Sequence, residues 1–123
     1  MISIIIPTCN RDEMLNITLS SLLKEVDHLD AEVIVVNDAV GRTPVIPGEI
    51  GGKIVLLNNP KKSVGAARNF GVRKSKGDYI IFLDDDFLIS KDSLLALQDL
   101  LEKHPDKVIN AAWIYPPDLL EEI

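Results

Sequence analysis

Residues 79–86 read YIIFLDDD, an apolar run of five residues that ends abruptly in three consecutive carboxylates. A short, continuous apolar run predicts a strand that is buried on both faces of a sheet. Neighbouring carboxylates repel one another by roughly a kcal/mol or more per close pair in partly screened surroundings. We therefore expect a divalent cation or an ammonium group beside residues 84–86, and a solvated turn that stops the strand is the alternative.

Similar apolar runs recur along the chain and alternate with segments of helical periodicity. Strands are predicted at 2–6, 33–36, 53–57, 79–83 and 108–112, and helices at 11–26, 63–76 and from 90 through 101. Pro7 is expected to close the first strand. Asn10, followed by Glu13, is expected to cap the first helix, and Ser90 the third. Residues 39–52, rich in glycine and proline, predict a flexible loop that covers a site.

The order of these elements favours an α/β fold, with a mostly parallel, doubly wound sheet that carries helices on both faces. Continuous rather than alternating apolar strands are typical of parallel sheets, because both faces of such sheets are covered. A chain of 123 residues, 46% of them apolar, is long enough for one core. We therefore expect residues 1–123 to form a single domain.

The charge balance disfavours several classes of partner. A formal net charge of −6 argues against nucleic acid and anionic membrane surfaces, because phosphates are met by clustered lysine and arginine. Residues 61–76 do form a basic stretch, which is either a local anion-binding surface or the solvated face of a helix. Cys9 is the only cysteine, so no intrachain disulfide can form. No apolar run approaches a membrane span and the start lacks signal-peptide features, so we expect a cytoplasmic protein.

Polar residues follow four of the predicted strands, at 7–11, 37–38, 58–59 and 84–86. Ligands of open parallel α/β sheets collect at the carboxyl ends of the strands, where these residues would converge. Taken singly, each segment is equally well explained as a helix cap or a turn.

The second predicted helix begins with the small residues Gly65, Ala66 and Ala67. Small residues there either let the positive helix end approach an anion or let the helix pack tightly on the sheet, and both readings stay open. No G-x-G-x-x-G follows the first strand and no Walker A sequence occurs, so dinucleotide and P-loop sites are disfavoured.

Four segments together resemble the family-two GT-A glycosyltransferases: residues 3–11, 33–38, 65–71 and 83–86. They occur in the family's order, with its usual gaps, across nearly the whole chain. The resemblance implies a GT-A-like domain that binds a nucleotide diphosphate sugar, most commonly a UDP-sugar. It also implies individual roles. Pro7, Thr8 and Arg11, in the loop after the first strand, would line the nucleoside pocket, and Asp38 would hydrogen-bond the base. In the small-residue motif, Gly65 would form the opening turn and Arg68 would reach toward the nucleotide.

The same resemblance implies a divalent ion, Mg²⁺ or Mn²⁺, with Asp86 as a direct ligand. Asp84 and Asp85 match positions near the ribose and bridging to the metal, and Asp84 is counted among the metal residues. Such an ion takes only one or two protein carboxylates when phosphate oxygens and water complete its shell. Mn²⁺ suits these ligands equally well. We therefore expect the metal to bind weakly without nucleotide.

The resemblance further implies sugar transfer with inversion to an unknown acceptor, which requires a general base. Family-two catalytic domains continue beyond the fifth strand into the segment that binds the acceptor and carries this base, whereas the sequence stops at Ile123. We therefore assign no catalytic residue and expect a truncated or minimal relative of a full domain. The apolar residues within 113–123 suit self-association or fold back as core.

Two other functions are kept as alternatives. The first is a non-catalytic nucleotide-sugar-binding module or an inactive fragment. The second is a haloacid-dehalogenase-like phosphatase that uses Asp84 as nucleophile. The order of the elements argues against this phosphatase, because its acidic motif belongs on the first strand and is followed by a lysine and a second acidic pair.

Overall fold

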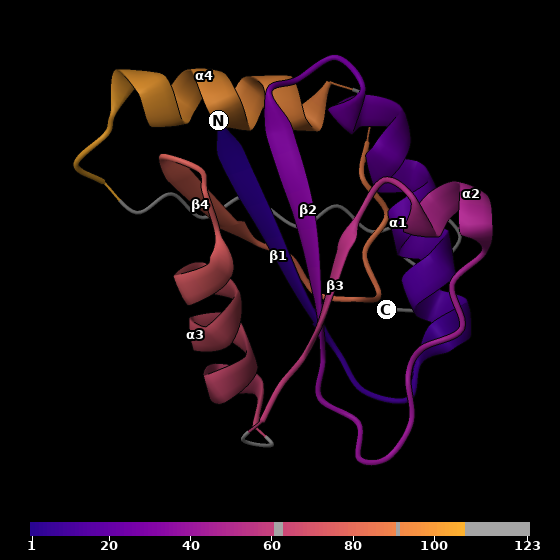
Figure 1. Ribbon diagram of the computed structural model, residues 1–123. Helices are drawn as coiled ribbons and strands as arrows, with labels where there is room; N and C mark the ends of the chain where they lie inside the picture. Colours follow the sequence, from indigo (N-terminus) through magenta and orange to yellow (C-terminus); the bar gives the residue numbers. More distant parts are fainter. Residues whose placement is uncertain (61–62, 91, 108–123) are drawn as a thin grey trace, which may run out of the picture.

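The strands of the computed structural model, which describes residues 1–60, 63–90 and 92–107, all run parallel to their neighbours (Figure 1). They lie in the order β3-β2-β1-β4 within one sheet. Their bounds are β1 Ile2–Thr8, β2 Ala31–Asn37, β3 Val55–Asn58 and β4 Tyr79–Phe82. The parallel sheet predicted from the continuous apolar runs is confirmed.

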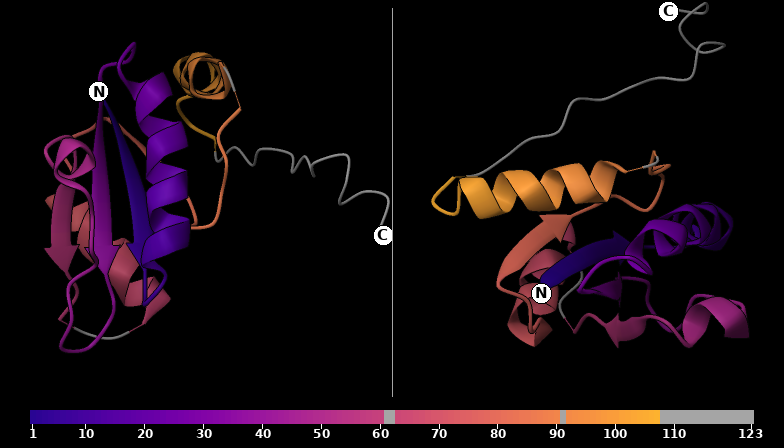
Figure 2. Two further views of the ribbon diagram at one scale, coloured as in Figure 1. Left: turned by 90° about the vertical axis from the view of Figure 1, so that its right-hand side faces the viewer. Right: turned by 90° about the horizontal axis from the view of Figure 1, so that it is seen from above.

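Helices cover both faces of this sheet, as predicted. Their bounds are α1 Asp12–Val26, α2 Gly48–Gly51, α3 Val64–Lys74 and α4 Ser93–Lys103. Figure 2 shows α1 and α4 on one side of the sheet and α3 on the other. The short helix α2 lies beside α1 (Figure 1), and its Ile50 packs against the core on that side.

The core consists of two clusters because successive side chains of a strand point to opposite faces. On one face, Ile4 of β1 and Val35 of β2 pack with the leucines of α1, including Leu19, and all three are fully buried. On the other face, Ile5 and Val36 pack against Ala67 of α3. Strand β1 is buried along its whole length, and its two polar side chains, Ser3 and Thr8, both form hydrogen bonds.

Helix α3 lies very close to the sheet at Gly71. A Cβ added there would lie 2.6 Å from Ile5 Cγ2 and 3.2 Å from Val36 Cγ2, which is closer than carbon atoms pack. At Gly65, one end of the same helix, an added Cβ would have no atom within 4 Å. Tight packing therefore explains Gly71 and the buried Ala67, but it does not explain Gly65.

Strand β1 does not stop before Pro7, as predicted, but continues through it to Thr8. Proline lacks the backbone N–H that a sheet interior needs. Leu83 N–H donates to the Ile5 carbonyl, whereas Asp38 N–H donates to the Thr8 carbonyl. The backbone N–H and C=O groups of odd-numbered residues in β1 therefore point toward β4, and those of even-numbered residues point toward β2. The pairing of β1 with β4 ends at Ile5, so Pro7 has no ladder bond to lose on that side.

The predicted helix caps are wrong. Helix α1 follows Arg11, and no side chain caps it, because Asn10 adopts a left-handed backbone conformation with φ 54° and its Oδ1 accepts from Arg42 instead. Helix α4 follows Asp92 rather than Ser90 and also lacks a side-chain cap.

Other boundaries also differ from the predictions. The strand expected at 53–57 lies at Val55–Asn58, and the loop expected at 39–52 contains α2. The strand expected at 108–112 and the apolar tail at 113–123 lie outside the described residues, as do Lys61 and Lys62 of the basic stretch. Within residues 1–60, 63–90 and 92–107, no helix is both long and apolar enough to cross a membrane.

Candidate functional site

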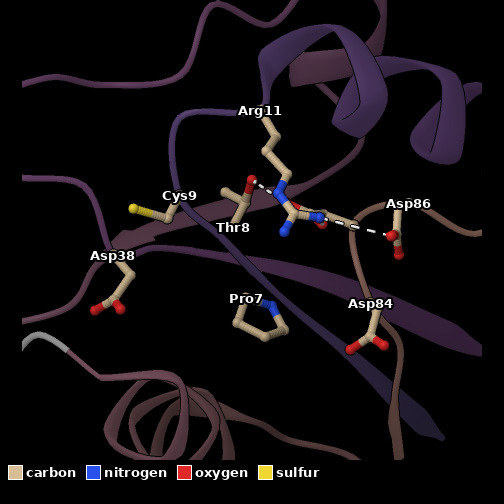
Figure 3. A pocket seen from close by; sticks show the side chains of 8 residues that line it. Pro7, Thr8, Cys9, Arg11, Asp38, Asp84 and Asp86 are labelled. Atoms are coloured by element: carbon tan, nitrogen blue, oxygen red, sulfur yellow. Dashed lines mark hydrogen bonds and ion pairs between the residues drawn. The ribbon is translucent and has the colours of Figure 1, made fainter.

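A cavity of about 330 Å³ opens where the carboxyl ends of β1, β2 and β4 meet (Figure 3). Three separate segments of the chain line it, with the residues Pro7, Thr8, Cys9, Arg11, Asp38, Asp84, Asp85 and Asp86. The parallel sheet accounts for this convergence, because parallel strands end at the same edge. Residues that are up to 79 positions apart in the sequence thus share one cavity wall.

The end of β2 is fixed by two side-chain bridges to the end of β3. The Nδ2 of the buried Asn37 donates to Asn58 Oδ1 at 3.0 Å, and Asn59 Nδ2 donates to Asp38 Oδ1 at 2.7 Å. Asn37 Nδ2 also donates to the Arg42 carbonyl at 2.7 Å. These bridges hold the Asp38 carboxylate at the cavity, and Figure 3 shows it on the opposite side of Pro7 from Asp84.

Two arginines form ion pairs with the three consecutive carboxylates. Arg11 Nη1 lies 3.3 Å from Asp85 Oδ1 and 3.6 Å from Asp86 Oδ2. Arg68 Nη2 lies 3.3 Å from Asp84 Oδ1. The repulsion that the sequence predicts is therefore relieved in part by guanidinium groups of the chain itself, although the exposed pairs with Asp84 and Asp86 each contribute only about 0–1 kcal/mol to stability.

The three carboxylates differ in exposure. The side chains of Asp84 and Asp86 are each 48% exposed, whereas that of Asp85 is 8% exposed. Thr8 Oγ1 donates to Asp85 Oδ2 at 2.9 Å, and Thr18 Oγ1 donates to the Asp85 carbonyl at 2.9 Å. The resemblance matched Asp84 and Asp85 to positions near the ribose and bridging to the metal, but within residues 84–86 only Asp84 and Asp86 present their carboxylates to solvent.

Gly65 and Arg68 lie on α3 and do not line the cavity. Ser63 Oγ accepts from Ala66 N at 3.1 Å and so caps the helix, while Gly65 is exposed beside it. Arg68 is connected to the cavity through Asp84. Its guanidinium lies 6.0 Å from the centre of the Phe82 ring, and its Nε is buried without a hydrogen-bond partner among the described residues.

Two features of this region were not assigned from the sequence. Cys9 lines the cavity with an exposed thiol, and its place between Thr8 and Arg11 was the available signal. The segment after β2 is tied to the start of α1, because Arg42 pairs with Asp12 through both guanidinium Nη atoms, and Val45 N donates to Asp12 Oδ2 at 3.0 Å.

This tie shifts the titration of both partners. The Arg42 guanidinium, and next the Val45 N–H, lower the pKa of Asp12 below its usual value of 3.8. Hydrogen bonding to Asp12 correspondingly raises the pKa of Arg42. The carboxylate and the guanidinium therefore stay charged over the neutral range, and this segment remains tied to α1 there.

No group of three or more histidine, cysteine, aspartate or glutamate side chains is arranged to hold a metal ion within the part of the chain that the structure describes. Asp84 and Asp86 offer hard carboxylate oxygens from one loop. A divalent ion at this loop would need further oxygens from a ligand or from water, as Mg²⁺ sites at nucleotides commonly do.

Comparison with known proteins identifies relatives of this arrangement. The family model described as glycosyl transferase family 2 matches residues 3–121. An uncharacterized glycosyltransferase of Haemophilus influenzae is 31% identical over 100% of the chain, which covers 40% of that protein. The poly(ribitol-phosphate) beta-N-acetylglucosaminyltransferase TarP of Staphylococcus aureus is 36% identical over 80% of the chain, which covers 31% of TarP.

A solved structure shares the fold. The crystal structure of S. aureus TarS 1-349 in complex with UDP matches with a TM-score of 0.72 and 24% identity, over 94% of this chain and 38% of that one. This likeness confirms the predicted α/β fold. The chain spans 40% and 31% of the lengths of the two relatives and 38% of the crystallised TarS chain.

Proposed function

The chain belongs to glycosyl transferase family 2, and we propose that it binds a nucleoside diphosphate sugar, with UDP as the nucleotide, for transfer of the sugar with inversion to an acceptor. One observation carries this proposal: three of the four segments that resemble the family, residues 3–11, 33–38 and 83–86, meet around a single cavity. The UDP in the crystal structure of TarS supports the choice of nucleotide.

The nucleoside would lie between the end of β1 and the end of β2. Pro7 and Thr8 form one wall, and Asp38, which also lines the cavity, would accept hydrogen bonds from the base. Asn59 donates to Asp38 Oδ1, so one carboxylate oxygen is already oriented by the protein. Because this orientation exists before the ligand binds, the base meets a fixed acceptor rather than a mobile one.

The diphosphate would lie toward the loop after β4, where Arg11 is available. Arg68 adds a second guanidinium, whose buried Nε still lacks an acceptor among the described residues. A buried donor without a partner is uncommon in folded proteins. A rotation of this side chain toward a phosphate would satisfy it.

The residues of the loop fit a divalent ion bound together with the nucleotide. Asp86 and Asp84 would hold Mg²⁺ or Mn²⁺, because both are half-exposed and supply the hard oxygens that these ions prefer. When bound, such an ion offsets the negative charge that develops on the departing nucleoside diphosphate. The chain's own part is to orient the nucleotide between Asp38 and Arg11.

A non-catalytic nucleotide-sugar-binding module is the second candidate. One observation favours it: the acidic side chains at the cavity within the described residues are Asp38 and residues 84–86, all assigned here to the donor or to structure. Among the described residues that line the cavity, no acid is left to act as the base toward an acceptor hydroxyl. Release of free sugar from a UDP-sugar by the purified chain would favour the enzyme over the module.

The phosphatase alternative has no support from the fold. Asp84 follows β4, which lies beside β1 at the end of the described sheet, whereas that class of enzyme carries its acidic motif after the first strand. The purified chain should therefore leave a generic phosphomonoester such as p-nitrophenyl phosphate intact. Turnover that Asp84→Asn abolishes would reverse this conclusion.

Calorimetric titration of the Asp86→Ala variant tests the proposed site. Wild type should bind UDP more tightly with Mn²⁺ than with EDTA, and Asp86→Ala should lose this difference while it keeps its melting temperature. The matched control is Asp99→Ala, which removes an exposed carboxylate of α4 that pairs with Lys103 away from the cavity. Asp99→Ala should bind like wild type. Unchanged metal dependence in Asp86→Ala would refute the assignment.

A further inference from the structure

Asp85 differs from its two neighbours because the protein occupies both of its carboxylate oxygens. Thr8 Oγ1 donates to Oδ2 at 2.9 Å and Arg11 Nη1 donates to Oδ1 at 3.3 Å. A buried carboxylate is costly unless it is paired and hydrogen-bonded, and Asp85 satisfies both conditions without any ligand. The Asp85 carboxylate would therefore lose hydrogen bonds if it turned toward the cavity when a nucleotide binds.

The position of the Asp85 backbone is fixed as firmly as its side chain. Thr18 is fully buried on α1, and its Oγ1 donates to the Asp85 carbonyl at 2.9 Å. Three elements thus converge on one residue: the end of β1 through Thr8, α1 through Thr18, and the loop after β4. Asp85 is consequently a rigid point at the wall of the cavity.

Arg11 is the side chain that this rigid point holds. Arg11 is 56% exposed, and an exposed arginine has many rotamers that it would lose on binding a ligand. Of its two acidic partners, Asp85 is buried and accepts a hydrogen bond, whereas Asp86 is 48% exposed and lies at 3.6 Å. Arg11 can therefore leave Asp86 for a ligand without leaving Asp85.

We infer that Asp85 is a positioning residue that anchors the Arg11 guanidinium at the cavity, while Asp84 and Asp86 remain available to the ligand. This inference rests on the proposed function, because it gives Arg11 a nucleoside diphosphate to meet. The consecutive acids then have different tasks. Asp85 holds Arg11 in an ordered conformation before the ligand binds, so less side-chain entropy is lost on binding. Asp86 releases Arg11 when the metal–nucleotide complex binds.

The test is a double-mutant cycle on the affinity for UDP in the presence of Mn²⁺. Asp85→Asn keeps the shape of the side chain but removes its charge, and it should weaken UDP binding by about tenfold or more, because a charge-assisted contact orients Arg11. In an Arg11→Ala background, the same substitution should have almost no further effect, since no guanidinium remains to be positioned.

Ser21→Ala is the matched structural control. It removes the hydrogen bond that Ser21 Oγ accepts from Ile89 N at 3.2 Å, which is another contact between α1 and the segment after β4, and it leaves every contact of Asp85 intact. Ser21→Ala should therefore lower the melting temperature and leave the UDP affinity unchanged. If Asp85 acted only through the fold, Asp85→Asn would behave like Ser21→Ala. Nitrogen-15 relaxation of the Arg11 Nε–H group keeps the inference testable even if Asp85→Asn does not fold: Arg11 should be rigid in wild type and in Asp86→Asn.

The outcomes separate the two levels of the proposal. Two results would overturn the positioning role alone, provided that wild type binds UDP. One is an unchanged UDP affinity in Asp85→Asn, and the other is additive effects of Asp85→Asn and Arg11→Ala on that affinity. An Arg11 Nε–H group that moves as freely as an exposed side chain would also overturn it. Wild type that binds no UDP would remove the proposed function, and the positioning role with it.

Discussion

Gly71→Ala should destabilise the fold, whereas Gly65→Ala in the same helix should not. At Gly71 the new methyl group would lie 2.6 Å from Ile5 Cγ2 and 3.2 Å from Val36 Cγ2. Ile5 cannot simply rotate away, because it is completely buried and its Cδ1 lies only 3.4 Å from the same point. The clash must therefore be relieved by moving α3 away from the sheet.

The magnitude follows from two opposing terms. Replacing a helical glycine by alanine gains up to about 1 kcal/mol of helix propensity, and overpacking a core typically costs about 1–3 kcal/mol. Both variants gain helix propensity. Only Gly71→Ala also has the overpacking cost, because at Gly65 no atom lies within 4 Å of the added methyl group. We therefore expect Gly71→Ala to be less stable than Gly65→Ala by about 1–3 kcal/mol.

Urea unfolding followed by circular dichroism measures this difference directly. The comparison between the two variants is more informative than either value alone, since the helix term is shared. Equal unfolding free energies for the two variants, or a more stable Gly71→Ala, would refute the close approach of α3 to β1 and β2. A displaced α3 should also separate Arg68 from Asp84, which now lie 3.3 Å apart.

Three other predictions concern stability, base recognition and acid sensitivity. Gly77→Ala should lower the urea midpoint strongly, because an added Cβ would lie 2.5 Å from Ser3 Oγ and 2.7 Å from Ser3 N; a wild-type midpoint would contradict this. Asp38→Ala should weaken UDP binding by about 1–3 kcal/mol in calorimetry if a partner on the base is left unpaired, and equal affinities would count against the assigned role. Arg42 holds the pKa of Asp12 below 3.8, so the stability that Asp12 adds is fully present above that pH and is lost as pH falls through the lowered pKa. Wild type and Asp12→Asn should therefore differ in unfolding free energy at neutral pH and converge in strong acid, and a constant difference would argue against the Arg42 pair.

The sheet could be predicted from the sequence because its signal is local. The apolar run at 79–83 is continuous and the run at 2–6 is nearly so, and a strand covered on both faces needs this pattern. Ser3 interrupts the second run, yet it is fully buried. Its hydroxyl donates to Glu32 Oε1 at 2.6 Å and accepts from Gly77 N at 2.8 Å. Such partners, remote in the sequence, leave no local pattern.

The two helix caps, Asn10 and Ser90, were predicted wrongly for the same reason. Asn10 and Ser90 are good caps by residue type. Arg42, which lies 32 positions away, engages the Asn10 side chain, and the left-handed backbone of Asp92 begins α4 two residues after Ser90. Capping rules weigh only neighbouring residues, so contacts of this kind override them.

The candidate site was predictable in location but not in detail. Polar residues after apolar runs indicated that the strand ends would meet, and Pro7, Arg11, Asp38 and residues 84–86 do line one cavity. The sequence offered no means to tell which of three consecutive aspartates is buried. That choice depends on hydroxyl groups of β1 and α1, which are known to be near only once the fold is known.

The central claim is that this cavity binds a nucleoside diphosphate together with a divalent ion. Calorimetric titration of the purified chain with UDP, GDP and dTDP, each with Mn²⁺ and with EDTA, tests it without knowledge of the acceptor. The account predicts binding of UDP in preference to the other two nucleotides, with an affinity that falls when EDTA removes the ion. Absence of binding to all three nucleotides would contradict it.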